Sequence, residues 1–231
     1  MTVPSLLVVP GAWHKPDHFR RLVDELPDLD VRTVTLTSSA DDPAALRDMY
    51  ADAEVIAQAA AAIDGPVVVI AHSYGGMPTT QGLPYATNVR RIIYLAAFQL
   101  QVGESLLTPN GGSLMPWAKL HQGDGNGDYV EATTPTTVFY NDLDARTAGR
   151  AVSQLGYQSY ASMRQELTAM AWKTIPSTYV VCESDNAIPV ATQELMAERA
   201  DDVERMNASH SPFLSQPAAL ADLIRRSLAS A

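Results

Sequence analysis

The sequence is poor in cysteine and contains a single one, Cys182, in 231 residues. One thiol cannot form a disulfide within the chain, so a disulfide framework is excluded. Cys182 lies in an apolar run with no polar activating group beside it, which favours a buried strand residue over a nucleophile. The phosphate-binding patterns G-x-x-x-x-G-K and G-x-G-x-x-G and the metal-binding patterns H-E-x-x-H and C-x-x-C are also missing. We therefore expect neither a cofactor nor a metal.

Positive charge is also scarce, because 16 Lys and Arg residues stand against 26 Asp and Glu, a formal net charge of −10 at pH 7. No block of basic residues occurs, which disfavours nucleic acid and anionic membrane surfaces as partners. No apolar run approaches the roughly 18 residues that span a bilayer. Residues 1–4 lack the basic region of a secretory signal peptide. We expect a cytoplasmic protein whose partner is a small molecule, and a homodimer is compatible with the sequence.

The stretch 67–76, V-V-V-I-A-H-S-Y-G-G, organises the rest of the chain. Its first four residues are β-branched and apolar, which predicts a strand buried on both faces, as in a parallel sheet. Residues 71–75 then match the nucleophile-elbow pattern G-x-S-x-G, with Ala71 in the first place. Such an elbow is a strained strand-to-helix turn that exposes a serine hydroxyl. Ser73 is the candidate nucleophile, and the alternative is an ordinary glycine-rich turn after a strand.

Strands and helices alternate along most of the chain. The patterns predict strands over 5–9, 31–36, 67–70, 91–98, 178–182 and 203–206. They predict helices over 17–26, 42–65, 74–85, 189–199 and 216–229, with a loop over 207–213. The helix at 42–65 would begin with Asp42 as its N-cap and Pro43 as its first residue. Strands that alternate with helices through short connections indicate a parallel sheet with crossover helices.

The alternation stops at residue 99 and resumes at residue 173. A structureless loop of this length is improbable in a compact domain, so the segment 99–172 is interpreted as an inserted cap, partly helical over 159–171. The run 123–128 lacks the Gly and Glu of a calcium-binding loop and is interpreted as a polar hairpin turn. The predicted fold class is α/β, a mostly parallel sheet flanked by helices. Its core consists of 1–98 and 173–231, and its cap of 99–172.

A serine nucleophile needs a base within hydrogen-bond reach, and the base needs an orienting acid. In folds built around such an elbow, the partners follow in the order Ser, acid, His. His210 alone among the five histidines follows a late strand, and it is the candidate base. The acid should lie just past the preceding strand, where Asp185 is the first choice and Glu183 the fallback. Weaker acid candidates lie in the inserted segment: Asp142 and Asp144.

An oxyanion hole would use the N–H group of the residue after the nucleophile, Tyr74, and one N–H group from the loop after the first strand. Ala12 is the best candidate in that loop, and Gly11 would allow close backbone approach. His72 is interpreted as a packed residue. Apolar residues of the cap could form a substrate chamber over the nucleophile: Leu106, Leu107, Met115, Trp117, Tyr140 and Tyr157. The predicted substrate contacts are Trp13, Trp117 and Tyr140.

Four stretches give the chain a resemblance to a known family: V-V-P-G-A-W-H, A-H-S-Y-G-G, V-V-C-E-S-D-N-A-I-P and S-H-S-P-F. They resemble the α/β-hydrolase superfamily, and more narrowly its branch of small esterases and hydroxynitrile-lyase-like enzymes. The resemblance spans nearly the whole chain. It implies that Ser73, Asp185 and His210 form a catalytic triad, and that Ala12 and Tyr74 supply the oxyanion N–H groups.

The sequence departs from this branch at several positions. Pro10 stands where many members carry His before the Gly, and Ala71 replaces Gly in the elbow. The hydroxynitrile lyases carry a Lys directly after the catalytic His and a Thr in the opening loop. Ser211 and Ala12 occupy those places here, which favours hydrolysis over lyase chemistry.

The sequence thus predicts a cofactor-free serine hydrolase that cleaves a carboxylic ester or lactone of a small apolar molecule through an acyl-enzyme. Two alternatives stay open. One is a lyase or pathway enzyme that uses the same triad as a base. The other is a non-catalytic ligand-binding protein on a hydrolase scaffold, since fold alone does not fix function.

Overall fold

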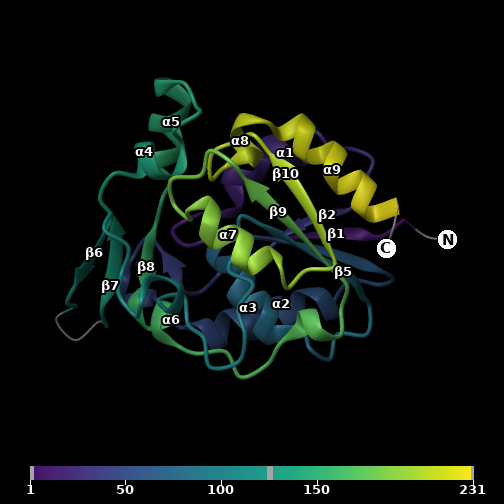
Figure 1. Cartoon of the computed structure of the whole chain (residues 1–231), viewed down its shortest axis with the longest axis horizontal. Coiled ribbons are helices and arrows are strands. Elements are labelled where there is room, and N and C mark those ends of the chain that lie inside the picture. The colour runs from purple at the N-terminus through teal and green to yellow at the C-terminus, as the bar shows by residue number, and fades with distance from the viewer. Residues whose placement is uncertain (1–2, 124–126, 230–231) are drawn as a thin grey trace.

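The computed structural model describes residues 3–123 and 127–229 (Figure 1). Among these residues, six parallel strands form the main sheet, in the order β10-β9-β5-β4-β1-β2. The strands are β1 (Ser5–Val9), β2 (Val31–Thr33), β4 (Val67–His72), β5 (Val89–Leu95), β9 (Ser177–Cys182) and β10 (Asp202–Met206). The predicted parallel sheet is confirmed.

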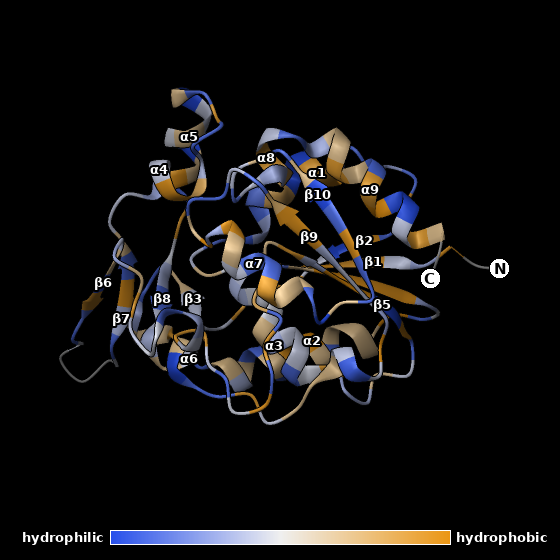
Figure 2. Ribbon diagram, viewed as in Figure 1, coloured by the Kyte–Doolittle hydropathy of each residue, from blue (hydrophilic) through white to orange (hydrophobic). Residues whose placement is uncertain are grey.

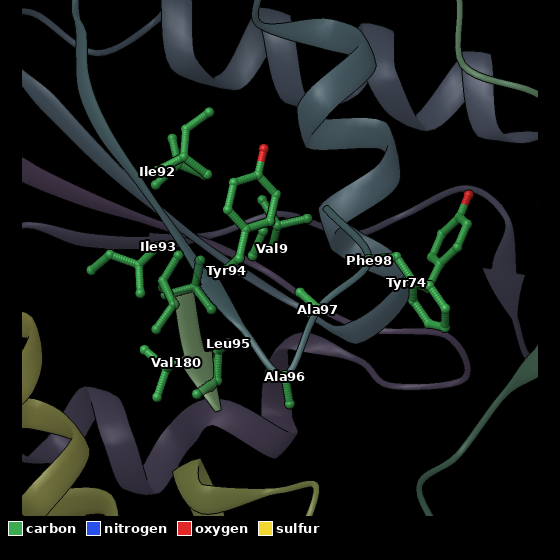
Figure 3. Close-up of a cluster of buried hydrophobic side chains, with 14 of the residues drawn as sticks. Val9, Tyr74, Ile92, Ile93, Tyr94, Leu95, Ala96, Ala97, Phe98 and Val180 are labelled. Carbon is green, nitrogen blue, oxygen red and sulfur yellow. The ribbon is translucent and has the colours of Figure 1, made fainter. Parts of the chain in front are cut away.

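The inner strands of this sheet form the centre of the hydrophobic core. Every residue of β4 and β9 is buried. Such strands are rich in β-branched residues because both faces are covered by helices. Figure 2 shows the hydrophobic residues concentrated on the sheet, with hydrophilic residues on the outer sides of the helices. Figure 3 shows Leu95 of β5 beside Val180 of β9, its partner in the sheet register, with Ile92 and Ile93 farther along β5.

Helices cover both faces of the sheet (Figure 1). On one face, α1 (Arg20–Asp24), α8 (Pro212–Ser215) and α9 (Pro217–Ala229) pack together. On the other, α2 (Met49–Ala61) packs on α3 (Gly76–Gly82), and α7 (Val190–Ala197) packs against β9. In the described part of the chain, no helix combines the length and the apolar character that crossing a bilayer would require.

Two strands differ in extent from the prediction. β2 ends at Thr33 instead of residue 36. The chain then turns at residues 37–38, where the Asp52 carboxylate accepts hydrogen bonds from the main-chain N–H groups of Thr37, at 2.6 Å, and Ser38, at 3.0 Å. β5 covers Val89–Leu95 rather than 91–98, and Ala96 after it has a positive φ of 40°, which ends the extended backbone.

The helix predicted over 42–65 is wrong at its start. Asp42 caps only a short 3-10 turn, by accepting a hydrogen bond from the Ala44 N–H at 2.9 Å. Leu46 then takes an extended conformation, and α2 begins at Met49 behind a second cap, Asp48. Both aspartates follow the N-cap rule, Asp42 at the 3-10 turn and Asp48 at α2.

Two other helix predictions and one loop prediction need correction. The helix predicted over 74–85 is a 3-10 turn at Ser73–Gly75 followed by α3, which ends at Gly82. Of the predicted 159–171, only α6 (Tyr160–Arg164) is α-helical. The predicted loop 207–213 already contains the start of α8 at Pro212.

The inserted segment, residues 99–172, carries much of a second sheet. This sheet is antiparallel, in the order β3-β8-β7-β6. Its strands are β3 (Ser39–Ala40), β6 (Ala118–His121), β7 (Tyr129–Ala132) and β8 (Tyr157–Ser159). Helices α4 (Pro135–Phe139) and α5 (Ala145–Val152) complete the segment with α6, at the left of Figure 1. β3 comes from outside the inserted segment and joins it to the core. The predicted polar turn at 123–128 lies partly outside the described residues.

Candidate active site

Four loops meet at the carboxyl ends of the parallel strands. Ser73 directly follows β4, and Ala12 lies in the loop after β1. Asp185 follows β9 and His210 follows β10. The carboxyl ends of parallel strands share one edge of the sheet, and ligands gather in the crevice outside them. A cavity lies at this edge and is lined by residues of both the core and the inserted segment.

Ser73 occupies a strained turn. Its φ is 52°, in the left-handed region that residues with a side chain rarely adopt. The two following glycines leave room for this turn: a Cβ on Gly75 would lie 2.4 Å from the Pro10 carbonyl oxygen, and one on Gly76 would lie 2.8 Å from that of Phe98. The helix and strand backbones thus crowd together behind the serine. This geometry matches the nucleophile elbow that the motif predicted.

His210 and Asp185 form a buried pair. The Nδ1–H group of His210 donates to Oδ2 of Asp185 at 2.7 Å. Asp185 also accepts hydrogen bonds from the N–H groups of Ala187, at 2.6 Å, and Ile188, at 3.0 Å, and from Nε2 of Gln193 at 3.1 Å. A carboxylate with this set of donors can only accept, so the proton of a neutral His210 lies on Nδ1. The lone pair of Nε2 is then available for another proton.

The other acidic candidates have different partners. Glu183 faces Arg205 at 3.8 Å, with both side chains about half exposed. Asp142 accepts hydrogen bonds from the Ser209 N–H, at 2.9 Å, and from the Ser209 hydroxyl. Asp144 caps the first turn of α5. Among the acids of the described residues, only Asp185 has a hydrogen bond to the His210 ring.

The cavity at this edge is narrow, with about 10 Å³ of free volume, room for about one water molecule. Ser73 and His210 both line it. So do two of the predicted substrate contacts, Trp13 and Trp117, and two apolar residues of the inserted segment, Leu106 and Met115. The remaining lining residues are Ala12, His14, Tyr74, Phe98, Phe139, Met163, Ala187 and Ile188. The wall is thus mostly apolar, and none of these lining residues is Asp, Glu, Lys or Arg.

Three residues that were expected over the nucleophile do not line this cavity. Tyr140 is buried, and its hydroxyl lies 3.0 Å from Nε2 of His14. Tyr140 therefore supports the wall of the cavity from behind instead of forming it. Leu107 is buried in the core, and Tyr157 is exposed on β8.

His14 is a cavity residue that the motifs did not single out. Burial, together with the neighbouring His18, lowers its pKa well below the usual value, so the ring is neutral. Its Nδ1–H group donates to the Ala12 carbonyl oxygen at 2.8 Å. Nε2 must then accept, and burial keeps the Tyr140 hydroxyl protonated by raising its pKa. The signal in the sequence was the histidine directly after Trp13 in the opening loop.

His72 is buried and packed, as expected from the sequence, and also makes a hydrogen bond. Burial lowers the pKa of its ring well below the usual value, so the ring is neutral. Nε2 of His72 lies 2.9 Å from the His210 carbonyl oxygen, which can only accept, so the proton is on Nε2. The bond connects the end of β4 with the loop that carries His210.

The two candidate oxyanion groups face the same cavity. Ala12 and Tyr74 both line it. The Ala12 N–H group has no hydrogen-bond partner in the described ranges, and the Tyr74 N–H group belongs to the first turn of a 3-10 helix, where amides lack a partner within the helix. Gly11 lies close behind the nucleophile, since a Cβ there would be 2.8 Å from that of Ser73. The arrangement can place two main-chain donors beside a carbonyl bound at Ser73.

The same edge of the sheet offers no obvious place for a metal. Within 3–123 and 127–229, no three His, Cys, Asp or Glu side chains converge in a way that could hold an ion. The buried histidines near the cavity are instead bonded to carbonyl oxygens: His14 to Ala12, His72 to His210 and His18 to Ala151. Their ring N–H groups point at main-chain acceptors.

Three features together define a hydrolase of the α/β type: a parallel sheet of this order, a serine on a strained turn after β4, and a His–Asp pair after β10 and β9. The comparison with known proteins agrees. The chain belongs to the alpha/beta hydrolase family, whose sequence model matches residues 6–223.

Two curated relatives are similar over nearly their whole length. Alpha/beta hydrolase nvfD of Aspergillus novofumigatus (strain IBT 16806) is 31% identical over 252 residues, covering 100% of this chain and 99% of its own. Probable hydrolase R7 of Phoma sp. (strain ATCC 20986 / MF5453) is 32% identical over 242 residues, covering 97% and 98%. Among solved structures, polyneuridine aldehyde esterase superposes with a TM-score of 0.83 at 17% identity, covering 97% of this chain and 99% of that one. The last similarity concerns the fold.

Proposed function

We propose that this hydrolase cleaves a carboxylic ester or lactone of a small apolar molecule through a covalent acyl-enzyme on Ser73. The observation that carries the proposal is the His210–Asp185 pair. Its hydrogen bond of 2.7 Å puts the His210 proton on Nδ1, and His210 lines the same cavity as Ser73. Nucleophilic catalysis by serine requires a base with a free Nε2 lone pair, and here that base shares one cavity with the serine.

In the first half of the reaction, Nε2 of His210 accepts the proton of the Ser73 hydroxyl while Oγ bonds to the carbonyl carbon of the substrate. The carbonyl oxygen becomes an oxyanion, which accepts hydrogen bonds from the N–H groups of Ala12 and Tyr74. Asp185 stabilises the charged His210 ring. The tetrahedral intermediate collapses when the bond to the alcohol oxygen breaks, and His210 returns its proton to that oxygen.

In the second half, water takes the place of the alcohol. Nε2 of His210 accepts a proton from this water, whose oxygen attacks the acyl carbon. The new tetrahedral intermediate releases the acid when the bond to Ser73 Oγ breaks, and Oγ regains the proton from His210. The reaction consumes one water molecule and needs no redox step.

The lining of the cavity supports an apolar, uncharged substrate. Aromatic and aliphatic side chains make up most of the wall, and burial keeps His14 neutral by lowering its pKa. A charged group on the substrate would lose its hydration here without gaining a counter-ion. The name of the structurally similar polyneuridine aldehyde esterase also agrees with ester cleavage. A substrate larger than a few atoms must displace residues of the inserted segment such as Met115 and Trp117.

The Ser73→Ala variant tests the proposal. We expect the purified variant to lose turnover of p-nitrophenyl acetate and p-nitrophenyl butyrate, and to lose labelling by a fluorophosphonate probe, while its thermal unfolding stays close to that of the wild type. A substrate panel of esters, lactones and thioesters of graded size then defines the acyl and alcohol groups. Full esterase activity in Ser73→Ala would remove the acyl-enzyme mechanism.

A further inference from the structure

Trp13, the residue after the proposed oxyanion donor Ala12, is held in a strained conformation. Its φ is 63°, which is costly for a residue with a large side chain. Three hydrogen bonds compensate this cost. The Trp13 N–H donates to Oε1 of Gln158 at 3.1 Å, its carbonyl accepts from the Gly156 N–H at 2.9 Å, and its indole N–H donates to the Val130 carbonyl at 2.7 Å. All three partners belong to the inserted segment.

Gln158 of β8 is the only one of these partners that acts through its side chain, and this side chain is completely buried. Its orientation is unambiguous because the Trp13 N–H can only donate, so the oxygen of the Gln158 amide must face it. The amide nitrogen donates to the Ser38 hydroxyl at 2.9 Å and to the Ser162 hydroxyl at 2.8 Å. Gln158 is thus fixed at both ends.

The polar contacts continue from Ser38 to the second proposed oxyanion residue. The Ser38 hydroxyl donates to Oδ2 of the buried Asp52 carboxylate. The Tyr74 hydroxyl donates to the same oxygen at 2.8 Å. Burial and the neighbouring Asp52 raise the pKa of the Tyr74 phenol well above its usual value, so this hydroxyl stays protonated. Figure 3 shows the Tyr74 ring lying apart from the β5 cluster, with its hydroxyl at the outer end.

These contacts form an unbroken buried path from the N–H group of Trp13 to the ring of Tyr74. We call it the Gln158 network, and its members are Trp13, Gln158, Ser38, Asp52 and Tyr74. Each link is a hydrogen bond between buried groups, where loss of one partner leaves the other unsatisfied. The path runs from Trp13, which follows the proposed oxyanion donor Ala12 in the loop after β1, to Tyr74, the second proposed donor, in the turn after β4.

We infer that Gln158 is a positioning residue, which fixes the spacing and direction of the Ala12 and Tyr74 N–H groups through this network. The inference rests on the proposed function, because it assigns Gln158 to the oxyanion hole of that mechanism. Gln158 does not line the cavity, so it acts on the substrate only through Trp13 and Tyr74. The inserted segment would then be part of the catalytic framework and more than a cover over the cavity.

The test compares Gln158→Leu with a matched control, Gln165→Leu. Gln165 also belongs to the inserted segment, and its Oε1 accepts a hydrogen bond from a core main-chain amide, that of Met49, at 2.8 Å. No hydrogen bond in the described residues joins its side chain to the Gln158 network. We expect Gln158→Leu to lower kcat for p-nitrophenyl butyrate by on the order of tenfold to a hundredfold with KM changed much less, because displaced oxyanion donors affect the transition state. Gln165→Leu should keep kcat within about twofold of the wild type.

A second measurement separates positioning from a general loss of structure. A trifluoromethyl ketone inhibitor adds reversibly to a serine hydroxyl and forms an oxyanion, so its affinity reports the oxyanion hole directly. For Gln158→Leu, the affinity of this inhibitor should fall by the same factor as kcat/KM. If Gln158→Leu does not fold, Tyr74→Phe tests the other end of the network, since it removes the hydroxyl and keeps the main-chain N–H group. The same split between kcat and KM is expected, with a smaller factor.

Several results would overturn the inference. One is a kcat of Gln158→Leu within twofold of the wild type. If Gln158→Leu does not fold, the same result for Tyr74→Phe counts instead. Another is an equal loss of kcat in Gln165→Leu, and a third is a loss of kcat with unchanged inhibitor affinity. A failure of the proposed function gives another result, because Ser73→Ala would then remain active. In that case both the acyl-enzyme mechanism and the role of Gln158 would be contradicted. An inactive Ser73→Ala combined with a fully active Gln158→Leu would overturn the role of Gln158 alone.

Discussion

The two sides of the candidate active site are built in different ways. On the acid–base side, Asp185 receives its hydrogen bonds from residues no more than eight positions away, up to Gln193, apart from the one from His210. On the oxyanion side, the N–H group of Trp13 is held by Gln158, which is 145 residues away in the inserted segment. The hydrogen bonds to the Asp185 carboxylate all come from the core, although Asp142 of the inserted segment bonds to Ser209 beside His210. The Trp13 N–H group, in contrast, depends directly on the inserted segment.

This difference implies that the two sides respond to different changes. The loop that carries Asp185 closes on itself, because a carboxylate accepting main-chain N–H groups two and three residues ahead forms a local turn. The loop that carries Trp13 is strained and depends on its partners. Changes at Gln158 should therefore affect the stabilisation of the oxyanion, and changes in the loop after β9 should affect proton transfer.

The largest expected effect is on the acid–base side. Asp185→Asn removes the carboxylate that fixes the proton of His210 on Nδ1, and the amide can instead donate to that nitrogen. We expect kcat to fall on the order of 10⁴-fold with little change in KM, as expected when the acid of a Ser-His-Asp site is replaced by its amide. The steady-state kinetics of p-nitrophenyl butyrate hydrolysis measure this.

Glu183→Gln is the matched control for that variant. Glu183 is two residues away and lies near Arg205 at 3.8 Å, exposed to solvent. Its kcat should stay within about twofold of the wild type, since exposed ion pairs contribute little. If Glu183→Gln were the inactive variant and Asp185→Asn the active one, the assignment of the acid would be wrong.

A smaller effect is expected on the oxyanion side from Trp13→Phe. The change keeps an aromatic ring in the cavity wall but removes the indole N–H group, leaving the buried Val130 carbonyl without that donor. We expect a loss of about 1–3 kcal/mol in the free energy of unfolding and a decrease in kcat on the order of tenfold. Urea unfolding and steady-state kinetics measure the two quantities.

Trp172→Phe loses the same type of bond at a residue that does not line the cavity. The indole N–H group of Trp172 donates to the Leu100 carbonyl at 2.9 Å, and both residues are buried. Its stability loss should be similar to that of Trp13→Phe, whereas its kcat should stay close to the wild-type value. Equal losses of kcat in the two variants would show that activity follows stability and that Trp13 has no special position.

The smallest effect concerns the buried histidines between the two sides. Burial lowers the pKa of His14 and His72 well below the usual value. Below about pH 6.5 the unfolded chain therefore binds protons that the folded chain does not, so the free energy of unfolding decreases as the pH falls. Their stabilisation is fully present above that pH and is lost as the pH decreases towards the folded-state pKa. His14→Gln should reduce this dependence by up to about 1.4 kcal/mol per pH unit.

Urea unfolding between about pH 7.5 and pH 5.5 measures the dependence. The Gln side chain can keep one hydrogen bond of His14 without titrating, so the variant should be less stable near neutral pH but should lose less stability on acidification. An identical slope in the variant and the wild type would contradict a neutral, buried His14.

The sequence was informative where geometry is local. The apolar run before Ser73 and the glycines after it predicted β4 and the turn, and the crowding at Gly75 and Gly76 leaves no room for a Cβ. The chain order predicted that His210 and Asp185 follow the last two strands of the sheet, and the carboxyl ends of parallel strands then bring them to one edge. The catalytic roles of these side chains stay predictions until the variants are measured.

The sequence was less informative where a contact spans the chain. Asp42 and Asp48 both fit the pattern of an N-cap, and the bond of the Met49 N–H to Gln165 helps to place the start of α2. No sequence motif marks Gln158, so the hydrogen bond between its side chain and the distant Trp13 N–H group could not be predicted. Tyr140 was expected in the cavity because of its apolar ring, but its hydroxyl is hydrogen-bonded to His14 and the residue does not line the cavity.

The most direct test of the account is to identify the intermediate. The wild-type enzyme is mixed with p-nitrophenyl butyrate, quenched in acid during turnover, digested and analysed by mass spectrometry. We predict one butyryl group on the peptide that contains Ser73. When deacylation is slow, this butyrylated form should accumulate in a burst equal to the enzyme concentration. Steady turnover with an unmodified Ser73 peptide, or with the butyryl group on another residue, would contradict it.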